Sequence, residues 1–210
     1  MKNLSKLLVL LLALAMLAGW FAACDGGKTP EDTTADETAE DTTAGGTQSG
    51  ENKEFVDYAS TVKFDPNSGR ASATVTVRTF VDGDTTHFNI DHPAFDGGIL
   101  KARYLGINTP ESTGQIEPWG KKASTYTKEA LSKATSIIVE SDSAQWNPDS
   151  TGDRYLVWVW YKTAEDTDYR CLNLEILQEG LAVSSKSSDT VYADICVTIL
   201  NQAVNHKLHV

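Results

Sequence analysis

Apolar and polar residues alternate in several stretches of this chain, and each of these stretches predicts a β-strand. The alternation is strongest in the first part of the chain, while the later stretches are rich in β-branched and aromatic residues, which favour strands. The predicted strands span residues 71–81, 85–90, 100–107, 136–141 and 155–161.

Three further stretches have the spacing of helices. In residues 118–134, Pro118 suits a first turn and the apolar residues fall on one face. Residues 172–180 predict a short helix that a glycine ends. Residues 189–206 have the clearest helical period. Their apolar stripe consists of Tyr192, Ile195, Cys196, Ile199, Leu200, Ala203 and Val204.

The beginning of the chain predicts export. Two lysines precede the apolar run 7–18, which is too short to span a membrane, and small residues then lead to Cys24. This pattern is similar to a bacterial lipoprotein cleavage site. Residues 1–24 are therefore expected to be a lipoprotein signal peptide, with Cys24 lipidated and the protein anchored on the extracellular side of the bacterial cell membrane. The alternative is an ordinary cleaved signal that leaves a free cysteine.

Residues 25–54 are rich in Thr, Asp, Glu, Gly and Ala and contain no aromatic residue, so they predict a disordered acidic tether. Residues 55–210 are long enough for one domain with a single core. The first 54 residues account for −5 of the net charge of −11, which leaves −6 for the domain. An acidic domain argues against tight non-specific binding to nucleic acid, because such binders neutralise phosphates with basic residues.

Residues 103–111 carry the most suggestive chemistry. Alternation places Arg103 on one strand face with Leu105 and Ile107, where a guanidinium is costly unless an anion meets it. The strand then ends at Asn-Thr-Pro, because proline cannot continue a ladder, and Glu111 follows. Upstream, Asp-Gly-Asp at residues 82–84 predicts a hairpin turn or bulge.

Taken together, these motifs resemble those of the staphylococcal (thermo)nuclease family. The family pattern is Asp-Gly-Asp-Thr, then Arg-x-x-x-x-Asp-Thr-Pro-Glu, then a second arginine before a strand of the Leu-Ala-Tyr/Trp-Val-Trp type. This chain has Asp-Gly-Asp-Thr at 82–85, Arg103 to Glu111, and Arg154 before Leu-Val-Trp-Val-Trp. The resemblance covers about residues 74–208. It implies an α+β fold, an OB-fold five-stranded β-barrel with three helices.

The resemblance also implies roles for individual residues. It places calcium ligands at Asp84, Asn108 and the carbonyl of Thr109, which are the oxygen ligands that Ca²⁺ prefers. It makes Arg103 and Arg154 the arginines that bind phosphoryl oxygens. Glu111 is the general base that takes a proton from the attacking water. The implied reaction is calcium-dependent cleavage of DNA and RNA that leaves 3′-phosphates, by a protein expected to be a monomer.

Two positions depart from the family pattern. Residue 108 is Asn instead of Asp, which removes one ligand charge and is expected to weaken cation binding. Gly152 and Asp153 replace the Tyr-Gly that often precedes the second arginine. The chain also stops where the third helix should end, which leaves open a truncated form of a longer lipoprotein.

Several assignments remain open at this stage. Tyr155 is a candidate for stacking on a nucleobase, with core or rim packing as the alternative. Cys171 and Cys196 form either a disulfide or separate buried thiols. The four histidines and the cysteines lack zinc-ligand spacing.

Three functions compete with a nuclease. The first is a catalytically weak or inactive OB-fold module that binds nucleic acid, which Asn108 and the acidic domain favour. The second is a surface lipoprotein that binds another ligand, and the third is a calcium-stabilised adhesion domain. Convergence of Asp84, Arg103, Glu111 and Arg154 on one open concave site would support the enzyme, whereas an Arg103 buried against a structural carboxylate would remove its main support.

Overall fold

The computed structural model describes residues 54–209. The predicted signal peptide with Cys24, and the tether up to residue 53, lie outside the described residues. Within 54–209, no helix combines the length and the apolar character that crossing a membrane requires.

Five strands form a closed barrel, which confirms the predicted α+β OB-fold. Strand β1 pairs antiparallel with both β2 and β5, β2 pairs with β3, and β5 pairs with β6. A parallel pairing between β3 and β6 closes the barrel. The strands are β1 (Ser72–Asp82), β2 (Thr85–Ile90), β3 (Ile99–Tyr104), β5 (Ser136–Glu140) and β6 (Tyr155–Lys162).

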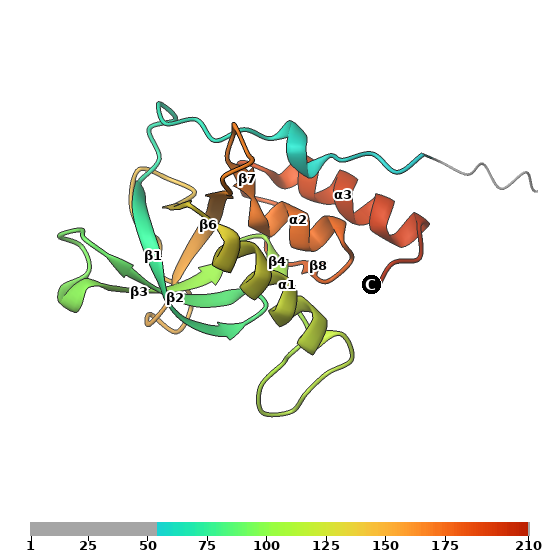
Figure 1. The fold of residues 1–210 in the computed structure, drawn as a ribbon, viewed down its shortest axis with the longest axis horizontal. Coiled ribbons are helices and arrows are strands. Elements are labelled where there is room, and N and C mark those ends of the chain that lie inside the picture. The colour runs from blue at the N-terminus through green and yellow to red at the C-terminus, as the bar shows by residue number, and fades with distance from the viewer. Residues whose placement is uncertain (1–53, 210) are drawn as a thin grey trace, which may run out of the picture. The chain divides into compact units, whose positions relative to one another are not determined.

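Three helices complete the domain: the first two pack against the barrel, and the third packs against the second (Figure 1). They are α1 (Gly120–Lys133), which contacts β1, and α2 (Leu172–Gln178) and α3 (Ala193–Asn205), which contact each other. Short elements complete the fold: β4 (Ile107–Asn108), β7 (Arg170–Cys171), β8 (Val183–Ser184), η1 (Ala59–Thr61) and η2 (Asp96–Gly98). Strand β4 pairs with β8, which makes a second, two-stranded sheet beside the barrel.

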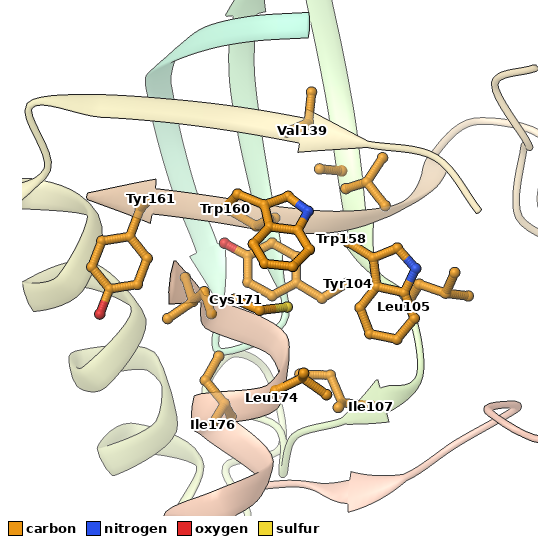
Figure 2. Packing of buried hydrophobic residues seen from close by; sticks show 14 of the residues in the cluster. Tyr104, Leu105, Ile107, Val139, Trp158, Trp160, Tyr161, Cys171, Leu174 and Ile176 are labelled. Carbon is orange, nitrogen blue, oxygen red and sulfur yellow. The ribbon is translucent and has the colours of Figure 1, made fainter. Parts of the chain in front are cut away.

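The core is centred on two tryptophans of β6. Trp158 and Trp160 are fully buried, and Figure 2 shows them grouped with side chains of β3 and α2. Each indole N–H still has a partner, since Trp158 donates to Asp142 at 2.9 Å and Trp160 donates to Glu140 at 3.0 Å. Their burial confirms barrel packing as their role. Cys171 and Cys196 are both free, buried thiols, so the disulfide alternative is wrong for this structure.

The predicted strand 100–107 is wrong as a single strand. Strand β3 ends at Tyr104, the chain turns at Gly106 with φ of 81°, and β4 begins at Ile107. A side chain at Gly106 would bring its Cβ within 2.9 Å of the Trp158 ring. The turn therefore needs a residue that accepts a positive φ and has no side chain. Because of it, Arg103 does not share a continuous strand face with Leu105 and Ile107.

Two predicted helix starts are also wrong. Helix α1 begins at Gly120, because the left-handed backbone of Trp119 (φ 68°) cannot be part of the helix. Pro118 therefore lies outside it. Helix α3 begins at Ala193 and not at residue 189, because the backbone of Tyr192 is not helical (φ −114°, ψ 24°).

Helix α2 secures the place where β3 separates from β6. The buried Asn173 donates from its amide to the carbonyls of Leu105 (2.9 Å) and Val157 (3.0 Å). Its Oδ1 accepts the N–H of Val159 at 2.9 Å. One side chain thus bonds to three buried backbone groups, of which the Val157 carbonyl also accepts the Leu105 N–H at 2.9 Å.

Candidate functional site

The turn between β1 and β2 is held against helix α1. A Cβ at Gly83 would lie 2.9 Å from the Cβ of Ala123, so only glycine allows this close approach. The Thr127 hydroxyl of α1 donates to the Gly83 carbonyl at 2.5 Å. Helix α1 therefore fixes the backbone position of Asp84, whose side chain is buried.

Strand pairing brings Arg103 beside Asp84. Thr85 lies opposite Arg103 in the β2–β3 register, and the Tyr104 N–H donates to the Asp84 carbonyl at 2.8 Å. Nη1 of Arg103 forms an ion pair with the Asp84 carboxylate, and Nη2 donates to Asn108 Oδ1 at 2.6 Å. The guanidinium thus bridges two side chains that were predicted as metal ligands. The anion expected to meet Arg103 is Asp84.

Thr109 lies against the same carboxylate. Its N–H donates to Asp84 Oδ2 at 2.8 Å, and the Thr85 hydroxyl donates to Oδ1 at 3.1 Å. The Thr109 hydroxyl is buried, and it has no hydrogen-bond partner among the described residues. A buried hydroxyl without a partner is costly, so this atom marks a place that a polar group or ion would satisfy.

Glu111 lies just beyond this cluster, on the exposed loop before α1. Its pKa is raised, first by a hydrogen bond with the Asp82 carboxyl, then by partial burial and by the charges of Asp82, Asp84 and Glu117. Asp82 is buried and accepts the Ser112 hydroxyl at 2.6 Å. Carboxyl groups therefore gather on both sides of the Thr109–Glu111 turn.

Arg154 stands just before β6, opposite the end of β3. Ala102 pairs with Tyr155 and Arg103 with Leu156, so barrel closure brings the two arginine-bearing segments together. Nε of Arg154 donates to Asp149 at 2.7 Å, and the Arg154 side chain is 36% exposed.

Both arginines line one groove, with a volume of about 280 Å³. Asp84 and Glu111 are not among its lining residues, although Asp84 contacts the groove through Arg103. The structure thus brings Arg103, Asn108 and Arg154 onto one concave surface. Asp84 adjoins this surface through its ion pair with Arg103, whereas Glu111 does not line it, so the predicted convergence is met only in part. The groove is lined by residues 103–108, Asp149, Ser150, Arg154, Leu156, Ser185 and Lys186.

Tyr155 does not line this groove. Its ring packs edge to face on Phe95, with the ring centroids 4.9 Å apart, and Phe95 packs in turn on Trp146. The half-buried Tyr155 therefore takes part in rim packing, and its contact with substrate stays a prediction.

Three residues at the site were not singled out from the sequence. Asp82 belongs to the Asp-Gly-Asp motif, whose first carboxylate could have been included. Asp149 opens an Asp-Ser-Thr-Gly stretch, which is a turn signal in which the carboxylate often caps nearby backbone groups. Lys186 lies in a serine-rich loop and has no recognisable pattern around it.

The predicted metal ligands can be tested against calcium chemistry. No three His, Cys, Asp or Glu side chains in residues 54–209 are arranged to hold a metal ion. The predicted set contains only one such side chain, Asp84, with an amide and a carbonyl. All are hard oxygen donors, and the oxygens of Asp84 and Asn108 already converge on a positive charge, the Arg103 guanidinium. The donor chemistry of the set therefore fits a hard cation, while the Arg103 guanidinium contacts two of its oxygens in this structure.

Comparison with known proteins gives one family. The family model described as "Staphylococcal nuclease homologue" matches residues 101–208. The matched segment includes Arg103, Asn108, Glu111 and Arg154, while Asp84 precedes it. No curated protein matches the chain.

Proposed function

Since this chain belongs to the family of staphylococcal nuclease homologues, we propose that it is a calcium-dependent phosphodiesterase that hydrolyses DNA, RNA or both. We place it as a monomer at the extracellular face of the bacterial membrane, anchored through lipidated Cys24. The family supports nuclease chemistry in general. Calcium dependence, the substrate and the catalytic residues are the finer parts of this proposal.

One observation carries the proposal. The Arg103 guanidinium contacts Asp84 and Asn108 together and at the same time lines the groove that Arg154 enters. Two planar guanidinium groups on one groove suit the tetrahedral oxygens of a phosphodiester, because each can donate paired hydrogen bonds to them.

Each side chain has a distinct role in the proposed hydrolysis. Arg103 and Arg154 donate hydrogen bonds to the non-bridging oxygens and stabilise the charge that develops on them. Glu111 accepts a proton from the attacking water. Asp84, Asn108 and Thr109 would hold Ca²⁺, which when bound supplies Lewis-acid polarisation of the phosphate. Asp149 holds the Arg154 side chain at the groove wall through its contact with Nε.

A catalytically weak or inactive binding module is the second candidate. The neutral Asn108 amide supports it, because this ligand accepts a hydrogen bond from Arg103 without adding charge for a cation. The net charge of −6 on residues 55–210 points the same way. Such a module would bind nucleic acid weakly and release it unchanged.

The test is hydrolysis of single-stranded DNA and of RNA by the purified protein, with calcium titrated against a chelator. Glu111→Gln should lower kcat by about 10²–10⁴. Arg103→Lys should also lower activity, because a lysine ammonium cannot donate paired hydrogen bonds as a planar guanidinium does. The matched controls are Glu129→Gln and Arg78→Lys, which change exposed residues away from the groove.

Calcium-dependent cleavage that both site variants lose and both controls keep supports the proposal. A folded protein that binds oligonucleotide but does not cleave it at any calcium concentration supports the binding module. Equal activity of Glu111→Gln and the native protein would remove Glu111 from the mechanism.

The anchor is tested separately. Detergent-phase partitioning of the protein should be lost in Cys24→Ser, while nuclease activity is unchanged. If the native protein stays in the aqueous phase after expression in a bacterial host, the proposed lipid anchor is wrong.

A further inference from the structure

The charges on the groove are almost balanced. Arg103 is paired with Asp84, and Arg154 is paired with Asp149, so each arginine already has a carboxylate partner. Lys186 also lines the groove, and it forms no ion pair within residues 54–209. The uncompensated positive charge on the groove wall therefore belongs to Lys186, in a domain that is acidic as a whole.

The backbone holds Lys186 in place beside the site. It follows β8, which pairs with β4 so that Val183 lies opposite Asn108. The Ser185 N–H donates to the Gly106 carbonyl at 2.9 Å, and the hydroxyls of Ser184 and Ser187 share a hydrogen bond at 2.5 Å. Lys186 itself has a left-handed backbone with φ of 51°. A non-glycine residue adopts this conformation at a cost, which the surrounding contacts offset here.

The groove offers little to a nucleobase. Among its lining residues the aromatic one is Tyr104, which is 1% exposed and whose hydroxyl shares a hydrogen bond with Thr86 at 2.9 Å. Stacking on an exposed ring is the usual way to hold unpaired bases. A groove lined by cationic side chains suits instead the phosphates of a nucleic acid strand.

We propose that Lys186 binds a phosphate next to the one that Arg103 and Arg154 hold, so that the groove binds at least two consecutive phosphates. This inference rests on the proposed nuclease function and adds a substrate-binding residue to it. A lysine suits this contact, because its ammonium is a compact charge on a flexible stem and does not require one fixed phosphate orientation. The site would then favour polynucleotides over substrates that contain a single phosphate.

The test compares the native protein with Lys186→Met, Lys186→Arg and the matched control Lys128→Met, which removes an exposed charge on α1. The substrates are a single-stranded oligothymidylate and a thymidine dinucleotide with one phosphodiester. Lys186→Met should raise KM for the oligomer about tenfold with kcat unchanged, while KM for the dinucleotide stays the same. The dependence of log KM on log salt should fall by about 0.7. Lys186→Arg should restore KM.

The outcomes separate this inference from the proposed function. Cleavage by the native protein, with the same KM and salt dependence in Lys186→Met as in Lys128→Met, overturns the inference alone. An equal loss on the dinucleotide also overturns it, because Lys186 would then contact the scissile phosphate. A native protein that cleaves neither substrate overturns both.

Discussion

Replacing Asp149 by Asn should lower stability in a way that depends on pH. The Asp149 side chain is only 7% exposed and accepts hydrogen bonds from Arg154 Nε (2.7 Å) and from the hydroxyl (2.5 Å) and N–H (2.9 Å) of Thr151. Burial alone would raise the pKa of Asp149. The hydrogen bonds from Thr151 and Arg154, with the charge of Arg154, outweigh burial and lower the pKa to about 2.

The magnitude follows from this pKa. An ordinary aspartate has a pKa of about 3.9, and each unit of difference corresponds to about 1.4 kcal/mol, which sets an upper limit of roughly 2.5 kcal/mol. Water screens the pair, because Arg154 is 36% exposed, so about 1 kcal/mol is expected. For a domain of this size that corresponds to a melting temperature lower by about 2–4 °C. Since the folded pKa lies below the unfolded one, this stability is present above about pH 4 and disappears as the pH falls toward 2.

The assay is urea unfolding, followed by tryptophan fluorescence, at a series of pH values from 7 to 2. The Asp149→Asn protein should be less stable at pH 7, and its difference from the native protein should vanish near pH 2. The matched control is Asp153→Asn, because that carboxylate is 72% exposed and pairs with Lys101 at the surface, so it should change stability little. A difference that stays constant down to pH 2 would refute the ion-pair explanation.

Three further predictions follow from other positions. Gly106→Ala should destabilise the protein by about 3 kcal/mol, through the left-handed backbone and the collision with Trp158, and a melting temperature within 2 °C of the native value (about 0.5 kcal/mol) would contradict this. Asn108→Asp should lower the calcium concentration for half-maximal activity about tenfold, and unchanged calcium dependence would exclude residue 108 as a ligand. Cys171 and Cys196 should resist a thiol reagent until the protein unfolds, because both are buried and burial raises the pKa of Cys196 to about 11. Peptide mass spectrometry measures this, and labelling within minutes under native conditions would contradict it.

The regular elements were predictable where side-chain alternation and backbone geometry agree. Strand β2 matches the prediction at both ends, because residues 85–90 alternate and a turn precedes them. The prediction failed at Gly106 and Trp119, where a positive φ breaks the run. A hydrophobic pattern records which side chains are apolar and contains no information about the sign of φ.

The site was predictable from motifs only in part. Arg103 and Asn108 do meet, because they flank one turn, and the β2–β3 hairpin brings Asp84 to them. Asp149 and Lys186 were missed, because they reach the groove on loops whose course depends on tertiary contacts. Sequence order could not place those loops beside one another.

The parallel pairing of β3 with β6 has a consequence for how this chain can vary. The register of that pairing places Tyr155 opposite Ala102, so it brings Arg154 close to Arg103 whatever the length of the loop before α1. Most residues between 111 and 119 are exposed, so extra residues inserted there would project into solvent. Length changes in that loop should therefore leave the two arginines in place but displace Glu111, whose N–H donates to the Glu117 carboxylate at 3.0 Å. The arginines and the proposed base are thus positioned by separate parts of the chain.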